Sequence, residues 1–186
     1  MTLPLAGQIL VAMPHVNNIM FEKSVIYVCG HDEYGSMGIL LNRPMENMKL
    51  SSLASMLDIE HANETVNKDY VYNGGSVESG RGFVLHTTDY FSHESVPITA
   101  DVAITASKDM ISAIISNKGP KKSIVSLGYT EWKKGALEDE IQNNLWINVD
   151  PENKESIFES NSSIWEEIYL SSFGISPYQI HACGRA

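Results

Sequence analysis

Short apolar runs closed by Pro, Gly, Asn or Asp follow one another along the first third of the chain. Three of them, at residues 8–13, 24–29 and 37–41, predict β-strands, because they are too short for helices and rich in β-branched or aliphatic side chains. The polar residues 31–35 predict the turn between the second and third strands. This part of the chain is therefore expected to be a group of strands joined by tight connections.

The middle and the end of the chain return to the strand pattern. Further strands are expected at residues 70–72, 82–86, 96–104, 123–127 and 145–149. Glycines predict one turn over residues 73–82 and a second turn over residues 128–132. Because the strands occur in hairpin-like groups and not in strict alternation with helices, the pattern favours a mixed α+β fold over a doubly wound parallel sheet.

Apolar residues spaced three and four apart predict short helices between the groups of strands. One helical face is shared by Leu50, Leu53, Ala54 and Leu57. Further helices are expected over residues 107–116, over residues 134–143, and from Ser163, which forms a capping-box pattern with Glu166, to about Gly174. No repeat, low-complexity tract or linker marks a boundary, so residues 1–186 are expected to form a single domain.

The composition is that of a folded protein with an acidic surface. Hydrophobic residues make up 43% of the chain and charged residues 19%, which leaves enough apolar surface to form a core. The formal net charge of -10 repels the phosphate backbone of DNA and argues against direct DNA binding. The two cysteines, Cys29 and Cys183, have no paired spacing, and we expect both to be reduced.

The apolar stretch at residues 3–13 gives no sign of a secretion signal or a membrane anchor. It carries no preceding positive charges and is far shorter than the ~20 residues that a membrane-spanning helix needs. We therefore expect a cytoplasmic protein that does not enter the membrane.

Three motifs with possible chemistry are only partly present. Ser36 lies in the spacing of a nucleophile elbow, but a tyrosine replaces the first glycine and a strand is expected to follow instead of a helix. Residues 75–82 have the glycine spacing of a P-loop without the lysine and hydroxyl that contact phosphate and magnesium. His86, Asp89 and His93 lack the regular spacing and the further ligand of a zinc site. No catalytic residue, cofactor or metal is therefore predicted.

Polar residues at the ends of predicted strands are the candidates for ligand contact. They are His31, Asn42, Arg43, Arg81 and His86. The alternative role for these residues is structural, because glycines and an arginine equally serve a turn and a salt bridge.

Arg43 is the most sharply defined of these candidates. The aliphatic run 37–41 is expected to be buried, so the chain leaves the core at Asn42, and Pro44 biases Arg43 toward extended geometry and ends the ladder of hydrogen bonds. A guanidinium held in this way suits either the carbonyl groups of a neighbouring turn or a carboxylate or phosphate. Bracing of another loop is the preferred interpretation, with an anion site as the alternative.

The ordered set of glycine-punctuated blocks is similar to that of a bacterial protein family. The blocks are residues 7–14, 38–44, 74–75, 82–86 and 128–132, accompanied by Phe21, Ser24, Val25, His31, Gly135, Leu137, Glu138, Glu140, Ile141, Asn144, Trp146, Gly184 and Ala186. No single block is decisive, but their order resembles the YqgE/AlgH family from Gly7 through Trp165. Ser36, Ser76 and Ala136 depart from the family pattern, in which Ala, Pro and Gln are usual.

The resemblance implies a compact α+β fold with coiled or bifurcated sheets, a bacterial cytoplasmic setting and no established biochemical activity. The alanine that is usual at position 36 further weakens a nucleophilic role for Ser36. The AlgH name carries a regulatory label, for control of alginate biosynthesis at the level of transcription. That label does not imply a DNA-binding surface.

Two functions from different classes follow from these observations. The first is a non-enzymatic regulatory or interaction protein with an indirect role in transcriptional regulation, which acts through a protein partner or a small molecule. The acidic charge and the incomplete motifs favour it. The alternative is a small-molecule binding protein or an enzyme with a polar cleft around His31, Asn42, Arg43 and His86.

Overall fold

A ten-stranded sheet forms the frame of the computed structural model, which describes residues 5–60, 70–151, 154–159 and 161–179. Its strands are β1 (Ile9–Ala12), β2 (Val25–His31), β3 (Gly35–Leu40), β4 (Pro44–Lys49), β5 (Tyr70–Asn73), β6 (Val77–Thr87), β7 (Val96–Pro97), β8 (Val102–Thr105), β9 (Ser123–Lys133) and β10 (Trp146–Val149). They lie in the order β10-β1-β2-β3-β9-β6-β8-β7, and β5 branches off β9 and carries β4. Neighbouring strands are antiparallel, except that β5 runs parallel to β9.

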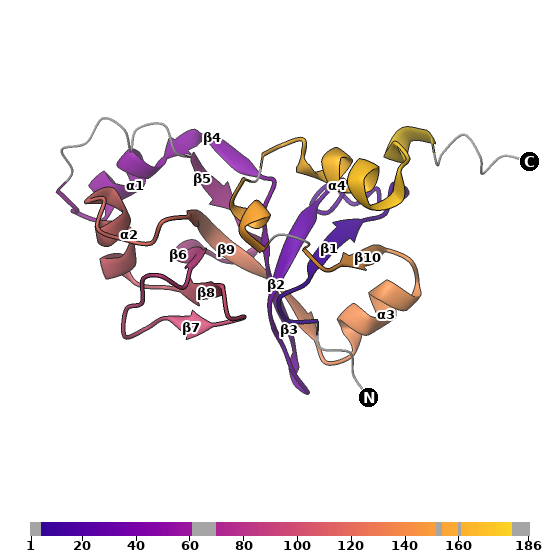
Figure 1. Ribbon diagram of the computed structural model, residues 1–186, viewed down its shortest axis with the longest axis horizontal. Helices are drawn as coiled ribbons and strands as arrows, with labels where there is room; N and C mark the ends of the chain where they lie inside the picture. Colours follow the sequence, from indigo (N-terminus) through magenta and orange to yellow (C-terminus); the bar gives the residue numbers. More distant parts are fainter. Residues whose placement is uncertain (1–4, 61–69, 152–153, 160, 180–186) are drawn as a thin grey trace, which may run out of the picture.

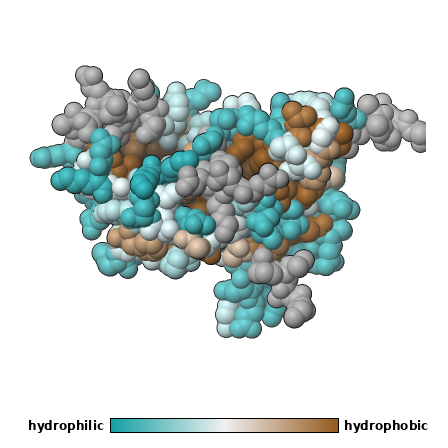
Figure 2. All heavy atoms as spheres, viewed as in Figure 1, coloured by the Kyte–Doolittle hydropathy of each residue, from teal (hydrophilic) through white to brown (hydrophobic). Residues whose placement is uncertain are grey.

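Short helices cover the two halves of this sheet (Figure 1). The half that contains β4 to β8 carries α1 (Leu50–Met56) and α2 (Lys108–Ile115). The half that contains β10 and β1 carries α3 (Ala136–Gln142) and α4 (Ile164–Phe173), and a 3-10 helix, η2 (Lys154–Glu159), precedes α4. Figure 2 shows hydrophobic residues gathered over α4 on this face of the molecule, where Leu170 is 62% exposed.

The predicted α+β class is confirmed, together with most of the predicted elements. The strands expected in the first third are β1, β2 and β3, and the four expected helices are α1 to α4. Ser107 caps α2 by accepting a hydrogen bond from the N–H of Met110 at 3.3 Å. Gly174 ends α4 in the left-handed conformation, with a φ of 66°. The branch of the sheet at β9 agrees with the coiled or bifurcated sheets that the family resemblance implies.

The predicted glycine turns over residues 73–82 and 128–132 are wrong, because both segments lie largely within long strands. β6 already begins at Val77, and its pairing register with β9 shifts between Val77 and Gly82, so this part of the segment is a bulge within the strand. β9 continues through Gly128, whose φ of 72° bends the strand without ending it. A bulge and a turn use the same residue types, and this is why the sequence did not separate them.

The ladder of β3 ends at Leu40, ahead of Pro44, as predicted, and Pro44 itself opens a further strand. β4 starts at Pro44, which pairs with Tyr72 of β5. A proline lacks the N–H that a ladder uses, but the first residue of a strand tolerates that loss. β4 was not predicted, because its sequence alternates too weakly to indicate a buried face.

Two other local predictions are also corrected. The single strand expected over residues 96–104 is a hairpin of the short strands β7 and β8. The capping box of Ser163 and Glu166 does not form, because Ser163 itself has helical dihedral angles and its side chain makes no cap hydrogen bond. Instead the side chain of Asn161 accepts the N–H of Ser163 at 2.6 Å.

Candidate functional site

The connection between β1 and β2 ends in a tight loop, residues 18–24, which we call the 18–24 loop. Its consecutive turns close on the side chain and the carbonyl group of Asn18. Lys23 has a φ of 51°, in the left-handed region that residues other than glycine rarely adopt. Such a conformation persists where neighbouring groups hold it in place. Here the neighbouring groups come from Asn42 and Arg43.

Asn42 fastens the 18–24 loop to the sheet. Its Oδ1 accepts the N–H of Val25 at 3.0 Å, and its Nδ2 donates to the carbonyl oxygen of Lys23 at 2.8 Å. The residue is only 3% exposed, so water does not replace these hydrogen bonds. An amide supplies the acceptor and the donor together, which accounts for asparagine at this position. The described contacts of Asn42 are structural.

Arg43 reaches the same loop through its guanidinium group. Its Nη2 donates to the carbonyl oxygen of Glu22, which is the bracing contact that the sequence predicted. Among the described residues this is the one hydrogen bond of the guanidinium, which has five N–H donors. Burial lowers the pKa of Arg43 from its ordinary value, and the charge of Glu22 opposes this shift. The guanidinium remains charged, and no described carboxylate lies within 4.0 Å of it.

A pocket with a volume of about 480 Å³, which we call the Arg43 pocket, opens beside this guanidinium. Its described lining residues come from three segments: the 18–24 loop, the end of β3 with the residues that follow it, and the chain from the end of β5 to the start of β6. They are Ile19, Met20, Leu40, Arg43, Asn73, Gly75, Ser76 and Ser79. Close backbone packing sets the position of the third segment. A Cβ atom on Gly75 would lie 2.1 Å from the carbonyl carbon of Tyr129, so a side chain at this position would push the wall of the pocket off β9.

The Arg43 pocket combines a polar wall with an apolar rim. The wall presents the Arg43 guanidinium, two exposed serine hydroxyl groups and the side chain of Asn73, whose Oδ1 accepts the N–H of Gly75 at 3.1 Å. The rim presents Ile19, which is 90% exposed, and Met20. No Asp, Glu, His or Cys occurs among its described lining residues, and these are the groups that most often transfer protons or hold metals. The pocket is therefore suited to binding.

His86 lies elsewhere, buried between β6 and β8. Its Nδ1 lies 2.9 Å from the carbonyl oxygen of Thr87, which can only accept, so Nδ1 carries the hydrogen. Its Nε2 then accepts the hydroxyl of Thr105 at 2.8 Å, and the Thr105 Oγ1 lies 2.8 Å from the Oγ of Ser95. Burial lowers the pKa of His86 below 6.5, against the opposing effects of the Thr87 carbonyl and the charge of Asp89. The imidazole is neutral, and both of its nitrogens are hydrogen-bonded.

His31 lies between a serine and a glutamate, in the order of groups found in a catalytic triad. Its Nδ1 lies 2.8 Å from the Oγ of Ser36, and its Nε2 lies 3.8 Å from a carboxylate oxygen of Glu138. A nucleophile, a base and an acid follow one another in this way in hydrolases. However, Ser36 is only 6% exposed, and 3.8 Å is too long for a hydrogen bond between the ring and the carboxylate. The arrangement gives no support to Ser36 as a nucleophile.

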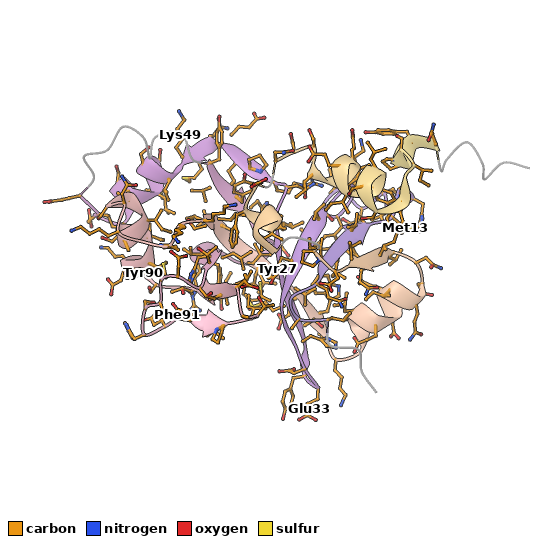
Figure 3. The ribbon with its side chains drawn as sticks, in the orientation of Figure 1. Met13, Tyr27, Glu33, Lys49, Tyr90 and Phe91 are labelled. Carbon is orange, nitrogen blue, oxygen red and sulfur yellow. The ribbon has the colours of Figure 1, made fainter. Side chains whose placement is uncertain are left out.

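The described structure does not bring His31, Asn42, Arg43 and His86 around one cleft. Asn42 is hydrogen-bonded to Val25, the first residue of β2, and His31 is the last residue of that strand. Since a strand rises ~3.3 Å per residue, Asn42 and His31 lie about 20 Å apart. The ring of Phe91 packs on His86, with the ring centroids 6.2 Å apart. Figure 3 shows Phe91 beside β7, well away from Glu33 at the tip of the β2–β3 hairpin.

Arg81 is also occupied separately, at an exposed position on β6. Its Nη1 lies 3.1 Å from a carboxylate oxygen of Glu78, and its side chain is 57% exposed. It is not among the described lining residues of the Arg43 pocket. A ligand-binding role for each of the five candidates stays a prediction, and only Arg43 lines a cavity described above.

Other reactive groups are few within the described ranges. No three His, Cys, Asp or Glu side chains there converge as metal ligands, and no helix there has the length and apolar character to cross a membrane. Cys29 packs against the core, and burial raises the pKa of its thiol far above 9.0, so the thiol stays protonated. Cys183 lies outside the described residues.

The sequence pointed to Arg43 but missed the other walls of its pocket. The 18–24 loop carries no motif, and the start of β6 was interpreted as a glycine-rich turn. One usable signal was the pair Gly74 and Gly75, since paired glycines often mark a close approach of two backbones. The sequence of one chain does not reveal which strand lies opposite.

Comparison with known proteins gives matches over nearly the whole chain. A family model described as AlgH-like matches residues 9–177. A UPF0301 protein of Methylocella silvestris is 43% identical over 180 residues, which cover 93% of this chain and 87% of that protein. A UPF0301 protein of Rhizobium etli is 38% identical over 182 residues, which cover 95% of this chain and 90% of that protein.

Two solved structures share the arrangement of strands and helices. The solution structure of the AlgH protein from Pseudomonas aeruginosa matches with a TM-score of 0.79 and 29% identity, covering 100% of this chain and 98% of that one. A crystal structure of a protein from Corynebacterium diphtheriae matches with a TM-score of 0.71 over 91% of this chain and 88% of that one. At 18% identity, the second match shows the fold alone.

Proposed function

Because this chain belongs to the AlgH-like family, we propose that it is a regulatory protein that acts by binding and not by catalysis. The Arg43 pocket is the observation that carries the proposal. A charged guanidinium with unused donors faces a cavity of about 480 Å³, which lies in the range of small-molecule sites, about 300–1,000 Å³. The described lining residues offer hydrogen bonds and apolar contact without a carboxylate, imidazole or thiol to transfer a proton.

The regulatory role in this proposal is indirect. The net charge of -10 opposes binding to the phosphate backbone of DNA, so an effect on transcription would pass through a small molecule or a protein partner. A single ligand with one or two charges meets much less of this repulsion than a polymer does. Ligand binding at the Arg43 pocket is therefore the first step of the proposed function.

A screen by thermal unfolding tests the proposal without assuming a ligand. A ligand present at 100 times its dissociation constant raises the free energy of unfolding by about 2.7 kcal/mol, which gives a clear shift of the midpoint. Compounds that stabilise the wild-type protein are then repeated on Arg43→Gln and on Arg81→Gln, which removes a guanidinium outside the pocket. Stabilisation that is lost only in Arg43→Gln supports the proposal.

Two results would overturn it. One is chemical conversion of a bound compound at a rate that Ser36→Ala abolishes, because this would make Ser36 and His31 catalytic. The other is tight, sequence-dependent binding to duplex DNA at physiological salt in a gel-shift titration.

A further inference from the structure

We propose that the Arg43 pocket binds a small organic anion, whose carboxylate or phosphate group takes the unused N–H donors of Arg43 and whose apolar part lies against Ile19 and Met20. The inference rests on the proposed function and adds the chemical class of the ligand. It follows from three features of the pocket: a charge without an ion pair in direct contact, a set of additional donors and an exposed apolar rim.

The charge of Arg43 has no counter-charge in direct contact. Its one described hydrogen bond goes to the neutral carbonyl group of Glu22, and the carboxylates in the described residues lie beyond 4.0 Å. A hydrogen bond to an anion stabilises a half-buried guanidinium more than a hydrogen bond to a neutral carbonyl group does. Arg81 shows the contrast, because it is more exposed and still pairs with Glu78. An anion in the pocket would supply the partner that Arg43 lacks.

The remaining polar groups of the pocket are matched to an anion rather than to a cation. No carboxylate occurs among the described lining residues, so a cationic ligand would meet only Arg43 as a charged group. The Ser76 and Ser79 hydroxyl groups and the Nδ2 of Asn73 can each donate a hydrogen bond toward a bound oxygen. A guanidinium presents parallel N–H groups that fit two oxygens of one carboxylate or phosphate.

The apolar rim indicates that the ligand is more than an inorganic ion. Ile19 is 90% exposed and Met20 is 39% exposed, although both are large apolar side chains on a loop held by hydrogen bonds. Leu40, at 1% exposure, forms the closed end of the same apolar surface. Covering Ile19 and Met20 with the chain of a ligand removes this surface from water, and each methylene group buried strengthens binding about fourfold.

Matched six-carbon probes test the ligand class directly. Hexanoate, hexyl phosphate, hexanol and hexylammonium share one chain and differ in the head group, and acetate keeps the carboxylate without the chain. Binding is followed by the NMR signal of the labelled Met20 methyl group, which reports on the pocket itself. We expect both anions to bind, hexanol and hexylammonium to bind at least tenfold more weakly, and acetate to bind more weakly than hexanoate. The two anions also rank carboxylate against phosphate.

Variants separate the roles of the head group and the chain. Arg43→Gln is expected to weaken the binding of hexanoate about ten- to hundredfold, since a hydrogen bond to a charged group is lost. Arg43→Lys keeps the charge and should restore part of the affinity, which excludes a simple folding defect. Ile19→Ser should weaken the binding of hexanoate but leave the affinity for acetate unchanged. Arg81→Gln, the matched control, should stay within about twofold of the wild type, as expected for an exposed paired charge.

Each contrary outcome has a distinct meaning. If hexanol or hexylammonium binds at the pocket as tightly as hexanoate, the anion class is overturned while the proposed binding function stands. If Arg81→Gln weakens hexanoate as much as Arg43→Gln does, the anions respond to overall charge and the site at Arg43 is overturned. If no probe changes the Met20 signal, the ligand class is overturned, and the screen by thermal unfolding then decides separately whether the pocket binds anything.

Discussion

On the β6–β8 side of the sheet, His86 has both ring nitrogens hydrogen-bonded and is fully buried, whereas at the 18–24 loop Arg43 is half-buried and uses one of its five donors. Both residues looked alike in the sequence, as polar side chains near the ends of strands. In the structure they differ in how many of their hydrogen-bonding groups are paired within the protein. His86 has no capacity left for a ligand, while Arg43 has most of its capacity left.

The difference teaches that a buried polar group is a weaker sign of function than a partly buried one with unused donors. A group such as His86 stabilises the fold when its partners are present and destabilises it strongly when one is removed. A group such as Arg43 contributes less to stability and remains available for binding. The two regions should therefore respond to mutation in opposite ways.

The largest expected effect on stability is at His86, whose ring nitrogens are both hydrogen-bonded within the protein. His86→Ala should lower the free energy of unfolding by about 3 kcal/mol, because it opens a cavity and leaves the Thr105 hydroxyl without its acceptor. His93→Ala is the matched control, since that side chain is 76% exposed, and it should change stability by less than about 0.5 kcal/mol. Denaturant titration of both variants measures the difference. Equal effects would remove the contrast between the two regions.

The next effect concerns the loop that Arg43 shares with its neighbour. Asn42→Ala should lower the free energy of unfolding by about 2 kcal/mol, because the buried N–H of Val25 loses its acceptor and the strained Lys23 loses its support. Asn47→Ala, at an exposed position on β4, serves as the control and should be near neutral. If urea unfolding gives Asn42→Ala and Asn47→Ala the same free energy of unfolding, Asn42 does not hold the loop in this way.

Acidification should affect the His86 region selectively. The folded protein keeps His86 neutral because burial lowers its pKa, whereas the unfolded chain binds a proton near pH 6.5. The unfolded state therefore holds more protons below pH 6.5, so stability is unaffected by this group above pH 6.5 and falls as the pH decreases toward the pKa of the folded state.

His86→Gln removes the titrating group while keeping a hydrogen-bonding side chain. The difference in stability between wild type and His86→Gln should narrow as the pH falls below 6.5, when both are followed by thermal unfolding. Asp89 has a lowered pKa, so its own contribution to stability is lost only at more acidic pH, as the pH falls toward and below 3.8. A difference that stays constant across pH 6.5 would contradict a neutral, buried His86.

The smallest effect on stability is expected at Arg43. Arg43→Gln should lower the free energy of unfolding by about 1 kcal/mol or less, because it removes one hydrogen bond to the Glu22 carbonyl and also removes a half-buried charge. Calorimetric unfolding measures the change. A loss as large as that of His86→Ala would mean that Arg43 is mainly a structural brace, and the contrast between the regions would fail.

Prediction from sequence succeeded where a local pattern decides the structure. The apolar runs of β1, β2 and β3 are predicted as strands without knowing which strand pairs with which. The helical spacing of Met110, Ile111 and Ile115 likewise predicts the buried face of α2. It failed at β4, at the start of β6 and at the end of β9, where strand character depends on pairing with distant segments. Glycine marks a bulge and a turn in the same way until the opposite strand is known.

The same limit applied to the candidate site. The anchoring of Arg43 on another loop followed from residues next to each other in the chain, and the structure has it. The pocket did not follow, because Ile19 and Ser79 meet only through the pairing of β2, β3, β9 and β6. A cavity between distant segments is a property of the assembled sheet.

The position of β9 in that sheet also has a consequence for how the protein is made. In the described sheet, β3 pairs with β6 and β5 only through β9, which comes late in the chain. While the ribosome is still translating the segment before Ser123, β3 and β6 each have an edge that β9 has not yet paired and that another nascent chain can reach. The ladders of β3 and β6 against β9 can form only after β9 has left the exit tunnel, and until then these open edges are the places where misassembly between nascent chains would begin.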